Sequence, residues 1–140
     1  MMRAALACLM LSACATTAPL SPPERLAGCW INREIEATSM RWLPDAQRPG
    51  VLNGTRNNFA RIGQGRTARY TLEPSEQGWS LCELDASGAA SRCWIVAQGE
   101  GGVLEGGRAF IDRHGDRLRI SVIGDGQAQT IFAGRRDGCD

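Results

Sequence analysis

The 140-residue chain contains no lysine and only one histidine. A P-loop NTPase needs a lysine on the phosphates, and a Schiff-base enzyme needs a lysine amine, so both classes are excluded. All 16 basic residues are arginine, and the formal net charge is +1. That balance excludes a strongly basic nucleic-acid binder, and we expect no nucleic-acid partner.

The chain also has few residues that could bind a metal or activate a catalytic nucleophile. The cysteines form no CxxC pair, and a lone histidine cannot build a His-rich zinc site. That histidine, His114, precedes Gly115 in an expected turn, whereas a Ser-His-Asp triad needs a buried and oriented imidazole. We therefore expect no metal, no cofactor and no enzymatic activity.

The N-terminus has the layout of an export signal. Arg3 is followed by an apolar run over residues 4–11 and by small residues. The run is shorter than the roughly 20 residues that cross a bilayer as a helix.

Leu11-Ser12-Ala13-Cys14 resembles the lipobox of bacterial lipoproteins. The resemblance implies cleavage before Cys14 and acylation, such as palmitate, on Cys14. It also implies a chain tethered to the cell envelope, and Ala15 favours the outer membrane, facing the periplasm, over the inner membrane. The expected organisation is a signal peptide over residues 1–13, a lipidated tether over 14–24 and a β-barrel domain over 25–140.

Once the signal is removed and Cys14 is lipidated, four cysteines remain, namely Cys29, Cys82, Cys93 and Cys139. An even count in an exported chain predicts a disulfide framework, for which three connectivities are possible.

Strand register selects one of them. If residues 79–84 and 91–96 form a hairpin, Cys82 lies opposite Cys93 and Glu83 lies opposite Arg92. The same register also makes two apolar pairs, Leu81 with Trp94 and Trp79 with Val96, and a slip by one residue would break every pair. We therefore predict a Cys82–Cys93 bridge, which leaves Cys29 to pair with Cys139.

Short alternating segments separated by turn residues predict an all-β fold, a small antiparallel up-and-down barrel with two disulfides. Expected turns include Asn53-Gly54, His114-Gly115 and Asp125-Gly126, and the glycine-rich residues 99–107 are expected to form a hairpin loop. The expected strands are Gly28–Ile35, Thr38–Leu43, Asn58–Ile62, Thr67–Leu72, Gly78–Leu84, Ser91–Ala97, Arg108–Arg113, Arg117–Ile123 and Gln127–Ala133.

The last three expected strands form a unit with one apolar face. The two turns place Asp112 opposite Arg117 and Ile120 opposite Ile131. The apolar face then collects Ala109, Ile111, Leu118, Ile120, Val122, Ile131 and Ala133. The opposite, polar face carries a row made of Phe110, Arg119 and Phe132.

Gly28-Cys29-Trp30, followed near the C-terminus by Arg135, resembles the calycin (lipocalin-like) arrangement. The resemblance implies that Trp30 is buried with the Arg135 guanidinium near its ring. In an up-and-down barrel the first and last strands are neighbours, so we also expect them to pair. Residues 68–71 (Ala-Arg-Tyr-Thr), followed by Trp79, resemble part of the motif of periplasmic lipoprotein inhibitors of c-type lysozyme. Those inhibitors also use a lysine, which this chain lacks.

These features predict a membrane-anchored, non-enzymatic binding module for a small apolar ligand or an envelope component. The alternative is an inhibitor or scaffold that contacts another protein through surface loops. An open apolar interior of about 300 Å³ or more would favour the ligand. A filled interior with exposed Trp42 and Phe59 would favour the protein partner.

Overall fold

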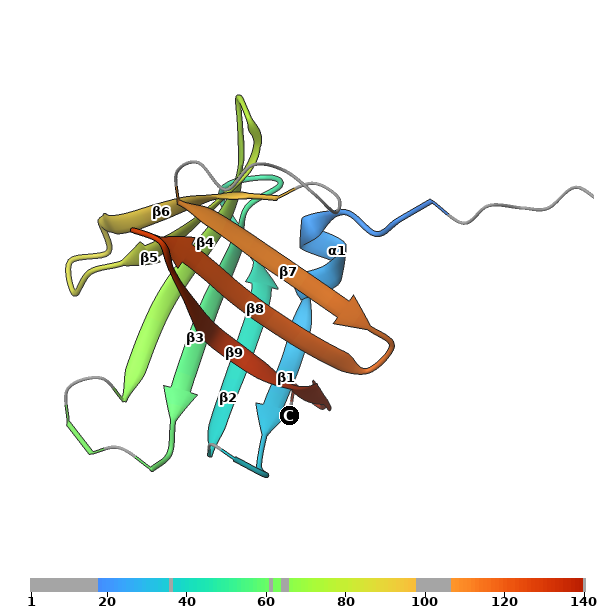
Figure 1. Cartoon of the computed structure of the whole chain (residues 1–140), viewed down its shortest axis with the longest axis vertical. Coiled ribbons are helices and arrows are strands. Elements are labelled where there is room, and N and C mark those ends of the chain that lie inside the picture. The colour runs from blue at the N-terminus through green and yellow to red at the C-terminus, as the bar shows by residue number, and fades with distance from the viewer. Residues whose placement is uncertain (1–17, 36, 61, 64–65, 98–106, 140) are drawn as a thin grey trace, which may run out of the picture.

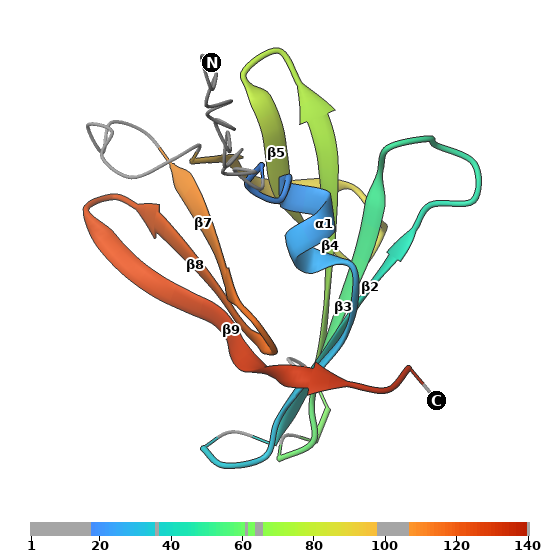
Figure 2. The same cartoon turned by 90° about the vertical axis from the view of Figure 1, so that its right-hand side faces the viewer.

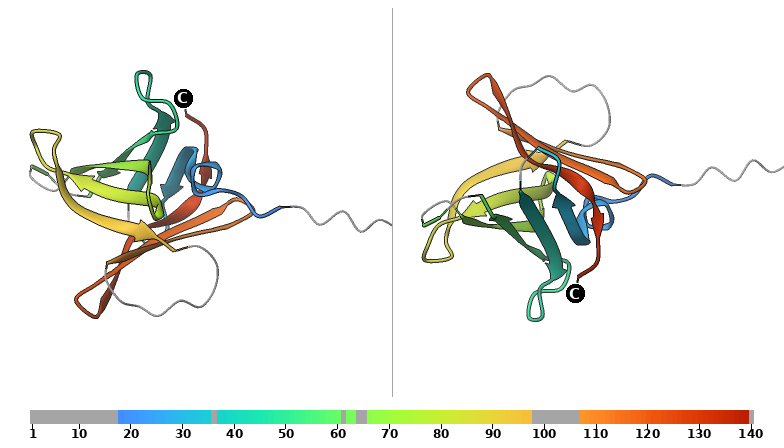
Figure 3. Two further views of the ribbon diagram at one scale, coloured as in Figure 1. Left: turned by 90° about the horizontal axis from the view of Figure 1, so that it is seen from above. Right: turned by 90° about the horizontal axis from the view of Figure 1, so that it is seen from below.

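The computed structural model describes residues 18–35, 37–60, 62–63, 66–97 and 107–139, so residues 11–14, which resemble a lipobox, lie outside the described residues. In the described residues nine strands form one closed barrel, which confirms the expected fold class (Figures 1 and 3). The strands are β1 (Gly28–Asn32), β2 (Thr38–Pro44), β3 (Leu52–Asn58), β4 (Thr67–Ser75), β5 (Gly78–Leu84), β6 (Ala90–Val96), β7 (Arg108–His114), β8 (Arg117–Gly124) and β9 (Gln127–Asp137).

One neighbouring pair departs from the expected up-and-down pattern, because β6 and β7 run parallel. A closed ring with an odd number of strands cannot alternate direction throughout, so one parallel pair is unavoidable. Parallel neighbours need a long crossover, and the expected hairpin over residues 99–107 is therefore wrong. Residues 98–106 lie outside the described part of the chain.

The third strand is Leu52–Asn58 and not the expected Asn58–Ile62. Asn53-Gly54 is strand, although an Asn-Gly pair is a typical turn sequence. Gly54 lies opposite Trp42 on β2, and a Cβ at Gly54 would come within 2.6 Å of the Trp42 ring. The glycine is thus required by the aromatic ring packed over it.

The hairpin of β5 and β6 has the predicted register. Cys82 pairs with Cys93, Glu83 with Arg92, and Leu81 with Trp94. The Cys82–Cys93 disulfide is formed, and Arg92 Nη2 lies 2.6 Å from Glu83 Oε2.

The second predicted disulfide, Cys29–Cys139, is also formed, with the two Cα atoms 5.3 Å apart. It lies where β1 pairs antiparallel with β9 and closes the barrel. Both bridges and the pairing of the first and last strands are therefore confirmed.

The β7–β8 turn is formed by Gly115 and Asp116, so His114 is the last residue of β7 and pairs with Arg117. Gly115 has φ of +60°, as the first position of a tight hairpin turn requires. The expected His114-Gly115 turn was wrong by one position, which shifts the register by two residues. A shift of two leaves every side chain on its expected face, so Ala109, Ile111 and Leu118 are buried as predicted.

The β8–β9 turn is Asp125-Gly126 as expected, and both residues have positive φ. Beyond it the register changes by one residue, because Ser121 pairs with Thr130 but Ile120 pairs with Phe132. Ile131 is thus the extra residue of a β-bulge, and such a bulge reverses the faces of all later residues. Phe132 is consequently buried, and the expected exposed row of Phe110, Arg119 and Phe132 is not formed.

A short helix, α1 (Pro22–Leu26), lies beside β7 at one end of the barrel (Figure 2). It begins within the segment expected to be tether, and the backbone N–H of Ser21 donates to Glu24 Oε2 at 2.8 Å. Leu26 is fully buried, and its carbonyl accepts a hydrogen bond from Trp30 Nε1 at 2.8 Å. The helix thus belongs to the folded unit.

Candidate functional site

The interior of the barrel is occupied by large side chains. β2 alternates buried and outward residues, as expected for a strand with one face in a core. One cluster of buried residues fills the barrel, and its largest fully buried members are Trp30, Trp42, Leu26, Met40, Leu72, Leu81, Leu118, Ile120 and Val96. Trp42 is buried and not exposed, which corrects that part of the expectation.

Tyr70 is part of this interior and is 2 % exposed. Its ring lies 6.3 Å from that of Trp42, and burial raises the pKa of its phenol above the usual value of 10.0. The charge of Arg56 acts in the opposite direction. Arg56 crosses the interior, and its Nη1 donates to the carbonyl of the bulged Ile131 at 2.8 Å.

Trp30 is buried beneath an arginine, but that arginine is Arg136. The Arg136 guanidinium lies 5.0 Å from the centre of the Trp30 ring, and its Nη1 donates to the Ala27 carbonyl at 3.0 Å. Gly28 has φ of +115°, and a Cβ there would lie 2.9 Å from Arg136 Nη2. Arg135 is exposed on the outer surface, because the bulge at Ile131 exchanges the two faces of β9. The expected placement of Arg135 is therefore wrong by one residue.

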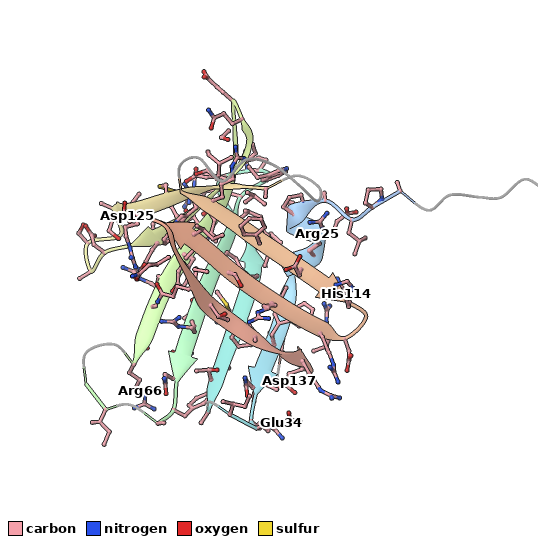
Figure 4. The ribbon with its side chains drawn as sticks, in the orientation of Figure 1. Arg25, Glu34, Arg66, His114, Asp125 and Asp137 are labelled. Carbon is pink, nitrogen blue, oxygen red and sulfur yellow. A yellow bond between two sulfur atoms is a disulfide. The ribbon has the colours of Figure 1, made fainter. Side chains whose placement is uncertain are left out.

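The outer surface carries a groove of about 770 Å³ at the junction of β8, β9 and β1. Cross-strand pairing places His114, Arg117 and Arg135 in one row over β7, β8 and β9. Ile31 of β1 continues this row beside Arg135. Figure 4 labels His114, Asp137 and Glu34 along this side of the barrel. We call this surface the arginine groove.

A second row runs beside the first. Asp112 lies opposite Arg119, which lies opposite Ala133. Five arginines and three acidic residues line the groove, so its formal charge is positive.

Several of the groove's arginines have little to neutralise them. Arg135 Nη1 is 4.0 Å from Asp116 Oδ2, and both side chains are more than half exposed, so the ion pair contributes little. Arg119 Nη2 donates to Thr130 Oγ1 at 3.4 Å. Arg117 makes no side-chain hydrogen bond or ion pair with another residue that the structure describes.

Exposed apolar side chains belong to two connections at the end of the barrel opposite α1. Ile35, Phe59 and Ile62 lie in the β1–β2 and β3–β4 connections, which Figures 1 and 2 show at the same end. Phe59 is 54 % exposed, and Ile62 is 96 % exposed. The Phe59 N–H donates to the Ala37 carbonyl at 2.7 Å and ties the two connections together. We call Ile35, Phe59 and Ile62 the apolar end.

The other expected site residues are placed as follows. Cys14 lies outside the described residues. The four bridged cysteines and Gly28 belong to the closure of the barrel and of the β5–β6 hairpin. Sequence reasoning missed the arginine groove, because a register without the bulge turns Arg135 inward and separates it from Arg117.

In the described part of the chain, the only helix is far too short to cross a bilayer. Comparisons with protein-family models, with curated proteins and with solved structures find no match for this chain.

Proposed function

We propose that the protein is a membrane-anchored lipoprotein of the bacterial envelope that binds another envelope protein through its surface loops and has no enzymatic activity. One observation carries the choice of surface. The barrel interior is filled by Trp30, Trp42 and their neighbours, whereas the apolar end exposes Phe59 and Ile62 to solvent.

The apolar end suits a protein contact. Large side chains gathered on an otherwise polar surface mark interaction sites, while a single exposed one does not. The hydrogen bond between Phe59 and Ala37 holds the two connections in place, so the surface is partly organised before binding. An apolar ligand inside the barrel would have to displace buried tryptophans, and for that reason we place binding on the outside.

The anchor is proposed from the lipobox at residues 11–14. Acyl chains contribute about 0.8 kcal/mol of membrane affinity per buried CH₂. Cys14→Ser should therefore release the protein from membranes washed with high salt, while wild type stays in the pellet. A Cys14→Ser protein that still pellets with membranes would contradict the anchor but leave the proposed binding surface untouched.

The binding surface is tested by native mass spectrometry of protein purified from its own membranes. We expect a co-purified protein with wild type, and loss of that protein with the double variant Phe59→Ser/Ile62→Ser. The matched control is Leu43→Ser, which removes an exposed apolar side chain of β2 outside the apolar end. A partner retained by the double variant, or a bound apolar small molecule in its place, would contradict the proposed surface.

A further inference from the structure

We propose that the arginine groove is a binding site for a phosphate monoester, whose phosphate is held by Arg117 and Arg135. The proposal rests on Arg117 and Arg135, which lie outside the apolar end, although Ile35 of the apolar end also lines the groove. It does not depend on the proposed protein contact.

The first step of the argument is the position of the two arginines. Arg117 and Arg135 are directly opposite each other on neighbouring antiparallel strands. Such residues have Cα atoms about 4.5–5.5 Å apart. Like charges in this arrangement are destabilising. The barrel thus holds a repulsive pair that an anion between the two guanidinium groups would relieve.

The second step concerns what already neutralises them. Asp116 reaches Arg135 only at 4.0 Å and in solvent, and Arg117 has no polar side-chain partner among the described residues. Asp112 faces Arg119 in the neighbouring row and not Arg117. The donors of Arg117 are therefore available to a ligand.

The third step selects phosphate among anions. A planar carboxylate is satisfied by one guanidinium fork, whereas a phosphate monoester has three acceptor oxygens and a charge of about −1.5 to −2. Two opposed forks, flanked by His114 on β7 and by Arg119 two residues along β8, match the larger charge and the additional oxygens.

The fourth step concerns the group that is attached to the phosphate. Ile31 and Ala133 line the groove beside the arginines, and the groove of about 770 Å³ is much larger than a phosphate. A short carbon group attached to the phosphate would lie against these side chains. A lipid headgroup and a soluble phosphate ester share this chemistry.

The test is a ¹H–¹⁵N NMR titration of the full mature chain in a maltoside detergent, which carries no phosphate. The probes are inorganic phosphate, glycerol 3-phosphate, dioctanoyl phosphatidic acid and, as a carboxylate control, acetate. We expect the phosphate esters to bind and acetate not to bind, with affinity falling as salt is raised. Tighter binding of glycerol 3-phosphate assigns the soluble source, and tighter binding of phosphatidic acid assigns the lipid source.

Two variants test whether Arg117 contributes to phosphate binding. Arg117→Gln should weaken binding about tenfold, because a charge-assisted hydrogen bond is lost. Arg41→Gln is the matched control, since Arg41 is exposed on β2 and does not line the groove, and its affinity should stay within about twofold of wild type. Arg117→Gln should not lower the Tm, because it removes one member of a repulsive pair. Equal binding of acetate, no binding of any phosphate probe, or an unchanged affinity in Arg117→Gln would overturn the proposal.

Discussion

The guanidinium of Arg136 lies 5.0 Å above the Trp30 ring, while the side chain of Arg135, one residue earlier, is exposed on the outer face of the same strand. Arg113 lies 5.5 Å from the same ring. Trp30 is thus contacted by two cations, one from β7 and one from β9.

Arg136→Ala should lower the free energy of unfolding by about 1–2 kcal/mol, since it removes a cation–π contact and a hydrogen bond to the Ala27 carbonyl. Arg135→Ala is the neighbouring control and should change it by less than about 0.5 kcal/mol. Urea denaturation followed by tryptophan fluorescence measures both. A larger loss of stability for Arg135→Ala than for Arg136→Ala would mean that the bulge is not at Ile131.

The bridge from Arg56 to the bulge gives a second prediction. Arg56→Met keeps much of the side-chain volume but leaves the carbonyl of Ile131 without its donor inside the barrel. We expect a loss of about 1–3 kcal/mol in the free energy of unfolding. Arg41→Met, on the exposed face of β2, should be nearly neutral, and equal losses in the two variants would argue against the internal hydrogen bond.

The two disulfides should differ in their effect on stability. The Cys29–Cys139 bridge joins residues 110 positions apart, and the Cys82–Cys93 bridge joins residues 11 positions apart. In the chain-entropy model the first contributes about 5 kcal/mol and the second about 3 kcal/mol. Thermal unfolding of the two Cys→Ser double variants should therefore give the lower Tm for Cys29→Ser/Cys139→Ser, and the reverse order would contradict the assignment of the long loop.

The lowered pKa of the Asp45 carboxyl group predicts that the protein loses stability in acid. A hydrogen bond from Asn53 holds the pKa of Asp45 well below its usual value of 3.8, and the backbone N–H of Gln47 adds to the effect. A lowered pKa in the folded state stabilises the fold above the unfolded-state pKa, and this stabilisation is lost as pH falls through the folded-state pKa.

Asp45→Asn should accordingly be less stable than wild type at pH 7, and the difference should shrink as the pH is lowered below 4. Asn53→Ala removes the largest cause of the shift and should change stability in the same direction to a smaller extent. Denaturant midpoints measured from pH 7 down to pH 2 test both variants. A difference that does not depend on pH would contradict the role of the Asp45 carboxylate.

Much of the fold was predictable where several residues constrain one register. Only one alignment of β5 and β6 gives a disulfide partner to Cys82, an opposite charge to Glu83 and an apolar partner to Leu81. The structure has that alignment. The β7–β8 register was wrong by two residues, but the core residues were still predicted correctly, because side chains alternate with a period of two. The parallel pair of β6 and β7 was not predicted, because residues 99–107 were expected to form a hairpin loop.

The bulge was not predictable in the same way. Thr130, Ile131 and Phe132 are all good strand formers, and an inserted residue leaves no local signature among them. At Gly54 the local sequence was misleading, because Asn53-Gly54 is typical of a turn. The glycine is found in a strand because the ring of Trp42, from the neighbouring strand, packs over it. Both errors concern how neighbouring strands fit together. The missed bulge concealed the arginine groove, and the misread Asn53-Gly54 pair put the expected third strand in the wrong place.

The Cys29–Cys139 bridge also decides how the molecule responds to mechanical force. Residues 29–139 form a covalent ring that contains all nine described strands, apart from Gly28 at the start of β1. When the two chain ends are pulled apart, tension passes from Cys29 through one S–S bond to Cys139 and bypasses the barrel. In the oxidised protein only the segments outside the ring extend under this load, and stretching the barrel to its contour length requires a reductant.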